Sequence, residues 1–222
     1  MDALLFMKEN SQRLPNKNVK VFCGKPLFCH IIETLLTVDG INKIYIDTDS
    51  QKIATSINAY LCNNRIIIMS RPKHLIGNHI TANSLIKGML DRIEGDDFLQ
   101  THVTNPLLTV TSINEAINLY KNSDNDSLFA VTKHSSPFYS NEGIPINHDP
   151  QIIEQSQNAT AIYEDNSNLY IFSRKSFNKF GRIGNSPIMF VTNKIESIDI
   201  NTKEDWKLAK ALKLKGSNYY VE

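Results

Sequence analysis

Short apolar runs alternate with amphipathic stretches over the first 132 residues, and this alternation limits the possible folds more than any other feature. The strand-like runs cover residues 3–7, 43–48, 65–69, 97–103 and 127–132, and helical spacing of apolar residues covers 26–38, 49–60, 80–93 and 112–122. Strands that alternate with helices form parallel sheets covered by helices on both faces. The sequence therefore predicts an α/β fold with a mostly parallel, doubly wound sheet.

The pattern changes after Lys133. Residues 134–168 are rich in Pro, Gly, Asn and Ser and show little periodicity, so they predict an excursion from the sheet, either a hairpin or an extended arm. Strands are predicted at 168–173 and 187–192, a short helix at 173–180, and a final helix after the acidic segment 201–205. Without repeats or a long linker, residues 1–222 are expected to form a single domain that carries this excursion.

Polar clusters follow the carboxyl ends of the predicted strands, at Lys8–Asn18, Asp47–Ser50, Arg71–Thr81 and His102–Asn105. Ligands of open α/β sheets bind outside the carboxyl ends of the strands. The coincidence of the clusters with the strand ends predicts a binding site at that edge of the sheet.

The loop after the first strand carries the cations Lys8, Arg13 and Lys17 among small hydrogen-bonding residues such as Ser11 and Asn18. Charge combined with directional donors suits a polyanion. A basic loop is also commonly a solvated surface segment, and the loop alone does not decide between the two.

Composition excludes several classes of partner. The formal net charge is +1, so no global field recruits nucleic acid or an anionic membrane. No apolar run approaches the length of a membrane span, and the first residues lack the layout of a secretory signal. Three cysteines without a CxxC pair fit free thiols in a reducing, cytoplasmic environment.

The order of motifs resembles the acylneuraminate cytidylyltransferase (CMP-sialic acid synthetase) family. The family's opening loop, close to ARGGSKGxPxKN, corresponds to residues 7–18, and its GKPL helix entry to residues 24–27. Further matches are the S-T-D turn at 48–50, the R-P…G-D segment at 71–78, Q-P-T-S-P-L at 101–107, Y-x-E-N…Y at 163–170 and V-D-I-D…E-D at 197–205. The match covers nearly the whole chain in the correct order.

This resemblance implies a Rossmann-like nucleotidyltransferase fold and the transfer of CMP from CTP to an acidic sugar, a sialic acid or a related nonulosonic or ulosonic acid, with release of pyrophosphate. The family pattern implies Lys8, Lys17 and Asp199 as catalytic residues, with Asp199 holding Mg²⁺. It implies nucleotide binding by Lys8, Ser11, Gln12, Arg13, Lys17, Asn18, Arg71 and Thr81, and acceptor binding by His102, Thr104, Asn105, Gln157 and Tyr163. It also implies a homodimer in which residues 134–168 contribute to the interface.

The chain departs from the family pattern at several positions. Asn201 stands where an aspartate is usual, and Gln155 where many members carry an arginine. These departures leave open a catalytically impaired relative that acts as a nucleotide-binding or partner subunit. A nucleotidyltransferase that uses a sugar 1-phosphate is less favoured, because its G-x-G-x-R loop is absent. For Asp199, a capping role at the final helix is the structural alternative.

Overall fold

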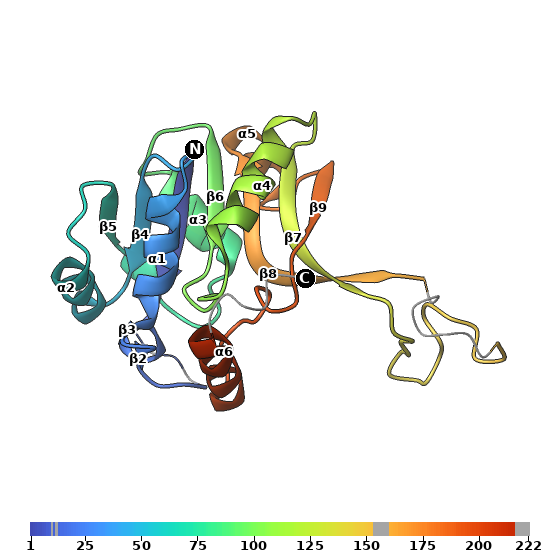
Figure 1. The fold of residues 1–222 in the computed structure, drawn as a ribbon. Helices are drawn as coiled ribbons and strands as arrows, with labels where there is room; N and C mark the ends of the chain where they lie inside the picture. Colours follow the sequence, from blue (N-terminus) through green and yellow to red (C-terminus); the bar gives the residue numbers. More distant parts are fainter. Residues whose placement is uncertain (10, 12, 153–159, 216–222) are drawn as a thin grey trace.

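A single seven-stranded sheet organises the computed structural model, which describes residues 1–9, 11, 13–152 and 160–215 (Figure 1). In sheet order the strands are β5 (Ile66–Ser70), β4 (Ile44–Thr48), β1 (Asp2–Met7), β6 (Asp97–Thr101), β8 (Ile162–Ser173), β7 (Ser127–His134) and β9 (Pro187–Val191). A second, two-stranded sheet joins β2 (Val21–Phe22) to β3 (Lys25–Pro26).

Strand direction confirms the prediction of a mostly parallel sheet. β1 pairs in parallel with β4 and β6, β4 with β5, and β7 with β9, whereas β8 runs antiparallel to both β6 and β7. The carboxyl ends of β1, β4, β5 and β6 therefore share one edge. Because β8 is reversed, its first residues reach that same edge.

Helices cover both faces of the sheet (Figure 1). They are α1 (Leu27–Thr37), α2 (Gln51–Tyr60), α3 (Ala82–Leu90), α4 (Val110–Lys121), α5 (Arg174–Phe180) and α6 (Lys203–Lys215), with short 3-10 turns at Lys17–Val19 and Lys73–Leu75. None of the helices in the described ranges combines the length and apolarity needed to cross a bilayer.

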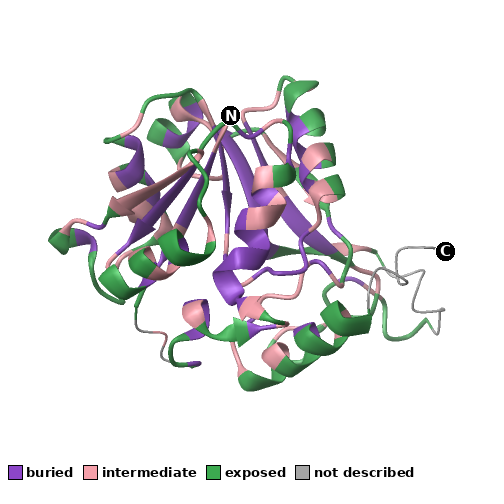
Figure 2. Cartoon of the chain, turned by 60° about the vertical axis from the view of Figure 1, so that its left-hand side comes forward, coloured by how far each residue is buried: buried purple, intermediate pink, exposed green. Residues whose placement is uncertain are grey.

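The core divides into two clusters because successive side chains of a strand point to opposite faces. Ala3 and Leu5 of β1 pack with buried residues of α1, α2 and α4, while Leu4 packs with α3 and α5. Figure 2 shows the burial concentrated in the strands and in the inner faces of the helices around them. Packing on both faces holds β1 and its neighbours in place and so positions the loops at their carboxyl ends.

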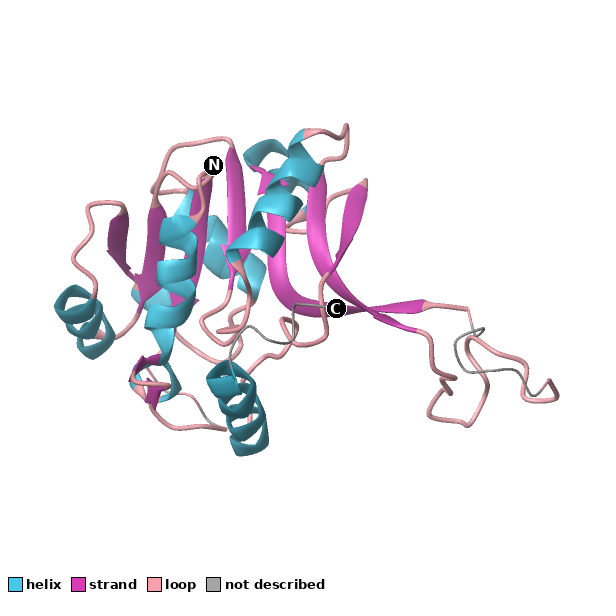
Figure 3. Ribbon diagram, viewed as in Figure 1, coloured by secondary structure: helices cyan, strands magenta, loops and turns pink. Residues whose placement is uncertain are grey.

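The predicted excursion is an arm between β7 and β8 that extends away from the helices and the rest of the sheet (Figure 3). β8 begins at Ile162, not at Asn168 as predicted. Its residues 162–165 pair only with β7, and pairing with β6 begins at Leu169. A stretch paired on one side and largely exposed has no need for apolar alternation, which explains why the sequence pattern does not reveal it.

Helix caps agree with the sequence pattern in part. Either Asp49 or Ser50 is expected to cap the helix predicted at 49–60, and Ser50 is the one that caps α2, since it accepts a hydrogen bond from the Ile53 amide. For the helix predicted at 112–122, the expectation that residues Ser112–Glu115 form a capping box at its start is wrong. Thr109 caps α4 by accepting from the Ser112 amide, so the helix begins at Val110.

Candidate active site

The loop after β1 is held by one hydrogen bond to the turn that follows β4 and by one between its own two ends. The Glu9 amide donates to Asp49 Oδ1 at 2.8 Å, and the Asn18 side-chain amide donates to the Lys8 carbonyl at 3.0 Å. Asn16 adopts the left-handed conformation (φ 55°) before the 3-10 turn. These contacts form the loop without the glycines of the family motif and place its polar groups at the end of β1.

A cavity of about 280 Å³ opens at this point. Its walls come from the end of β1, from the loop after it, from the segment between β5 and α3, and from the residues after β6. The lining includes Lys8, Ser11, Lys17, Asn18, Arg71, His102 and Thr104. Residues predicted at three different strand ends are thus brought together around one space.

Lys17 is buried, with 9% of its surface exposed, so the expectation of an ordinary surface loop does not hold there. Its Nζ donates to the Ile200 carbonyl at 2.7 Å and lies 3.5 Å from Asn201 Oδ1. Burial lowers the pKa of Lys17, and the nearby Asp199 carboxylate opposes that shift. The ammonium therefore connects the first loop of the chain to the segment before α6.

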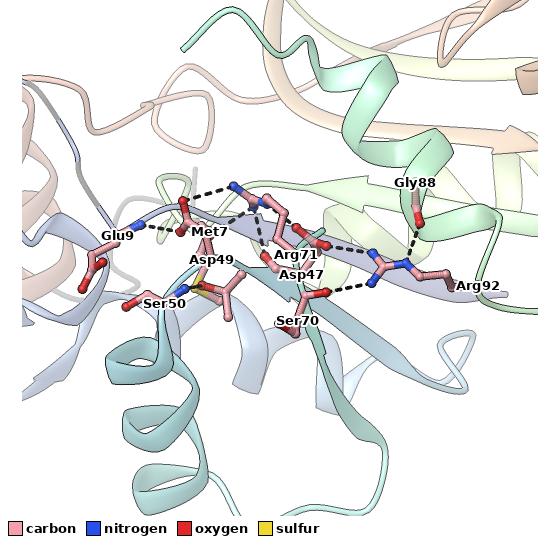
Figure 4. A network of polar contacts seen from close by, with 10 residues as sticks. Met7, Glu9, Asp47, Asp49, Ser50, Ser70, Arg71, Gly88 and Arg92 are labelled. Carbon is pink, nitrogen blue, oxygen red and sulfur yellow. Dashed lines mark hydrogen bonds and ion pairs between the residues drawn. The ribbon is translucent and has the colours of Figure 1, made fainter. Parts of the chain in front are cut away.

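Arg71 is fixed by a buried network of acidic groups (Figure 4). Its Nε lies 2.5 Å from Asp47 Oδ1, and its Nη2 donates to the carbonyls of Met7 and Asp47 at 3.1 and 3.2 Å. The second oxygen of Asp47 pairs with Arg92 at 2.9 Å. A carboxylate 1% exposed and shared by two guanidinium groups ties the ends of β1, β4 and β5 together.

Asp49 extends this network to the β1 loop. Its Oδ1 accepts from the Glu9 amide, and its Oδ2 lies 3.8 Å from Arg71 Nη1. Lys8 Nζ donates to Asn78 Oδ1 at 3.3 Å, in the segment between β5 and α3. The cationic side of the cavity is therefore positioned by buried or loop-anchoring acceptors on β4 and after β5.

A second hollow of about 490 Å³ is defined by acidic residues. It is lined by Thr132, His134, Glu164, Asp165, Asn166, Ser167, Lys194, Ser197, Asp199 and Asn201. Three of these described residues, Glu164, Asp165 and Asp199, carry carboxylates, and one, Lys194, is a lysine. The hollow and the cavity are neighbours, because Lys17 of the cavity contacts the segment 199–201, whose Asp199 and Asn201 line the hollow.

Asn201 connects the cations to Asp199. Its Oδ1 accepts from Arg13 Nη2 at 2.8 Å, and its Nδ2 donates to Asp199 Oδ2. The other oxygen, Asp199 Oδ1, is buried and has no hydrogen-bond partner within the described part of the chain. Asp199 does not cap α6, because Thr202 and Asp205 exchange the capping hydrogen bonds there.

His102 lies at the end of β6, with its ring edge against Phe6 at a centroid distance of 5.3 Å. Its Nε2 is 3.0 Å from Gln100 Nε2. Burial lowers the pKa of His102 to about 4, partly offset by Asp199. The imidazole is therefore neutral at physiological pH.

Four of the predicted residues occupy other positions. Thr81 is exposed and its Oγ1 caps α3 by accepting from the Ser84 amide. Asn105 is fully buried and its amide donates to the Ile198 carbonyl at 3.4 Å, which holds the two loops together. Arg13 is exposed and contacts Asn201 outside the cavity wall. Tyr163 is 42% exposed on β8, next to the hollow-lining Glu164. Gln12, Gln155 and Gln157 lie outside the described residues.

The residues that position the site are the ones that the sequence pattern does not single out. Arg92, Gln100 and Arg182 belong to none of the predicted clusters or motifs, and Asp47, Glu164 and Asp165 appear only as members of a cluster or a run. The available signal is the polar Asp47 and Gln100 inside otherwise apolar strands. A charged or amide side chain in a buried strand needs a hydrogen-bonding partner, so these two residues predict buried polar contacts.

The chain matches a known protein family along nearly its whole length. The family model described as "Cytidylyltransferase" matches residues 3–222. The chain belongs to the cytidylyltransferase family. Such a match covers the loop after β1, both walls of the cavity and the segment that carries Asp199.

Individual relatives agree with the family. This cytidylyltransferase is 25% identical over 214 residues to "Pseudaminic acid cytidylyltransferase" of Campylobacter jejuni, with 91% of each chain covered. It is 23% identical over 234 residues to "N-acylneuraminate cytidylyltransferase" of Escherichia coli, covering 99% of this chain and 54% of that one.

A solved structure shows the same fold. It is titled as a CMP:2-keto-3-deoxy-manno-octonic acid synthetase complexed with CTP, and it superposes with a TM-score of 0.68 over 96% of this chain and 98% of the other at 10% identity. Together with the parallel strands, this confirms the predicted Rossmann-like nucleotidyltransferase fold.

Proposed function

We propose that this cytidylyltransferase transfers CMP from CTP to a nonulosonic acid and releases pyrophosphate. The observation that carries the proposal is that two neighbouring spaces differ in the charge of the side chains that line them. The cavity presents Lys8, Lys17 and Arg71, whereas the hollow presents carboxylates, neutral polar groups and Lys194. A triphosphate needs the first. The second offers partners for the hydroxyl groups of a sugar acid, with Lys194 as the cation for its carboxylate.

The reaction consists of one displacement. The acceptor's hydroxyl oxygen attacks the α-phosphorus of CTP, a P–O bond forms, the bond to the β-phosphate breaks, and the hydroxyl proton is lost to solvent. Such transfers depend on positioning and on neutralisation of phosphate charge. Lys8 and Lys17 supply that charge, Ser11 and Asn18 supply donors, and the buried pair of Arg71 with Asp47 keeps the wall in place.

Asp199 fits a magnesium site completed by substrate. A buried carboxylate oxygen without a partner is a free hard ligand. No group of three or more His, Cys, Asp or Glu side chains able to hold a metal occurs within residues 1–9, 11, 13–152 and 160–215. Phosphate oxygens and water would therefore supply the remaining ligands, and the bound Mg²⁺ would neutralise phosphate charge.

We also propose a homodimer that forms through the arm. Tyr139, Ile144 and Ile146 are 53%, 61% and 58% exposed, on a segment that extends away from the rest of the sheet (Figure 3). Exposed apolar side chains on a projecting segment are typical of an interface.

Light scattering at micromolar concentration should give twice the chain mass of 25.2 kDa. Ile146→Asp should shift the mass towards that of the monomer. Leu119→Asp, on the exposed side of α4, is the matched control.

The test of function is pyrophosphate release by the purified protein with CTP, Mg²⁺ and a panel of pseudaminic, legionaminic, N-acetylneuraminic and shorter ulosonic acids. Release with at least one nine-carbon acid supports the proposal. CTP binding without release for any acid would favour the catalytically impaired relative. Neither binding nor release would contradict both.

A further inference from the structure

Three polar side chains behind the cavity form a relay from Arg182 to His102. Gln100 on β6 is fully buried and stands between them. Arg182 Nη1 lies 3.1 Å from Gln100 Oε1, and Gln100 Nε2 lies 3.0 Å from both the Thr101 carbonyl oxygen and His102 Nε2. Gln100 and Arg182 belong to no motif of the sequence, whereas Thr101 and His102 lie in the segment 101–107.

The orientation of the Gln100 amide is determined at both ends. A guanidinium has donors only, so the atom that faces Arg182 must be the oxygen. A backbone carbonyl accepts only, so the atom that faces Thr101 must be the nitrogen. One amide hydrogen is then used by the Thr101 carbonyl, and the second points at His102 Nε2.

We infer that this relay locks His102 in the neutral tautomer that carries its proton on Nδ1. A ring nitrogen that receives a hydrogen bond cannot carry a proton in the same direction, so Nε2 must be the acceptor. The ring then has one donor left, the Nδ1–H group. Arg182 and Gln100 are positioning residues that set this donor without touching a ligand.

The tautomer assigns a role to His102. The ring lines the cavity, and Nδ1 has no protein hydrogen-bond partner among the residues that the structure describes. His102 therefore donates a hydrogen bond from Nδ1 to an oxygen atom of the bound substrate. It does not act as the general base. That this oxygen belongs to the sugar acid, which must reach from the hollow to the α-phosphate and hence to the cavity wall where His102 lies, rests on the proposed function, whereas the tautomer itself does not.

The surroundings of the relay support a fixed geometry. The Arg182 guanidinium lies 3.8 Å from the centre of the Tyr170 ring, and the Tyr170 hydroxyl donates to Asp165 at 2.7 Å. The charged groups that act on the imidazole are Asp199, Arg182, Lys17 and Asp165, but burial has the largest effect and lowers its pKa to about 4. Protonation at Nε2 would also bring two donors face to face.

Long-range ¹H–¹⁵N NMR of the uniformly labelled protein tests the tautomer without any substrate. The His102 signals are assigned by their loss in His102→Asn. The expected pattern has a protonated Nδ1 and a bare Nε2, unchanged between pH 8 and pH 5. A protonated Nε2, a mixture of tautomers as in free histidine, or titration near the ordinary pKa of 6.5 would overturn the inference.

Two variants test the relay. Gln100→Glu replaces the donor with a carboxylate, so the proton is expected to move to Nε2 or the ring to become charged. Arg182→Gln removes the group that orients the amide, and a mixture of tautomers is expected even if Gln100→Glu does not fold. The matched control is Arg174→Gln, because Arg174 also lies over a core ring, 5.1 Å from the centre of Phe98, and does not contact Gln100. An unchanged tautomer in both relay variants would contradict the inference.

Kinetics separate this inference from the proposed function. Asparagine places its amide nitrogen where Nδ1 stands along the side chain, whereas phenylalanine offers no donor. His102→Phe should raise the KM for the acceptor about tenfold or more at unchanged CTP affinity, and His102→Asn should recover most of that loss. Equal loss in both variants would contradict a donor role. Absence of turnover with every acid would contradict the proposed function and leave the NMR result unaffected.

Discussion

The cavity and the hollow lie next to each other but are built differently. The cationic wall of the cavity rests on Asp47, 1% exposed, which pairs with Arg71 and Arg92. In the hollow, the pair of His134 with Glu164 involves a carboxylate 63% exposed. The side assigned to the nucleotide is thus fixed before any ligand binds, while the side assigned to the acceptor is open and supported by exposed groups.

This difference fits the two substrates. Phosphate transfer requires the α-phosphorus to be held accurately, and buried ion pairs and anchored loops provide that rigidity. The hollow is held less firmly at its rim, where Glu164, Asp165 and Lys194 are exposed. The comparison predicts that equivalent substitutions have unequal effects on the two sides.

The largest effect is expected from Asp47→Ala. Removing a buried carboxylate leaves Arg71 and Arg92 without their shared partner, at a cost of about 3–5 kcal/mol in the free energy of unfolding. Urea denaturation followed by circular dichroism measures it. Glu164→Gln on the hollow side should cost less than about 1 kcal/mol, since that pair is exposed. Equal losses would remove the contrast between the two sides.

A second prediction separates the substrates. Lys17→Met should weaken CTP binding by about a hundredfold, from the loss of a charge-assisted contact, and should also lower stability because the buried ammonium donates to the Ile200 carbonyl. Lys194→Met, in the hollow, should leave CTP affinity unchanged and raise the KM for the acceptor. Calorimetric titration with CTP, corrected for the folded fraction, measures the first effect. Normal CTP affinity in Lys17→Met would refute the assignment of the cavity.

How much of this arrangement can be predicted from the sequence depends on the range of the interactions. The order of strands and helices follows from local periodicity, and that order alone places Lys8, Arg71 and His102 at one edge of the sheet. The Asp47–Arg71 and Arg182–Gln100 contacts join residues 24 and 82 positions apart, and no local pattern encodes such pairs.

Burial and contacts between distant segments explain the remaining differences between the predicted and the observed roles of single residues. Lys17 belongs to a polar loop, yet the segment before α6 covers it. Thr81 matches a position assigned to the nucleoside, but its hydroxyl is used by the first turn of α3. The acidic character of the hollow depends on the reversal of β8, which brings Glu164 and Asp165 to the edge where Asp199 lies.

A smaller effect is expected from pH. The pKa of His102 is about 4 in the folded protein and near 6.5 when unfolded. Between these values the His102 imidazole binds a proton in the unfolded chain and none in the folded one. Its contribution to the free energy of unfolding is therefore fully present above about pH 6.5 and is lost as the pH falls towards 4. The decline from this residue is about 2–3 kcal/mol. His102→Asn should flatten the pH dependence of the urea midpoint in that window, whereas His74→Asn should not. An identical slope in wild type and His102→Asn would contradict the burial of the neutral ring.

A crystal structure of the protein with CTP and Mg²⁺ tests the central assignment most directly. We expect the triphosphate in the cavity, in contact with Lys8 and Lys17, and the metal at the Asp199 carboxylate. A triphosphate bound in the hollow among Glu164 and Asp165, or with Lys17 still donating only to the Ile200 carbonyl, would contradict it.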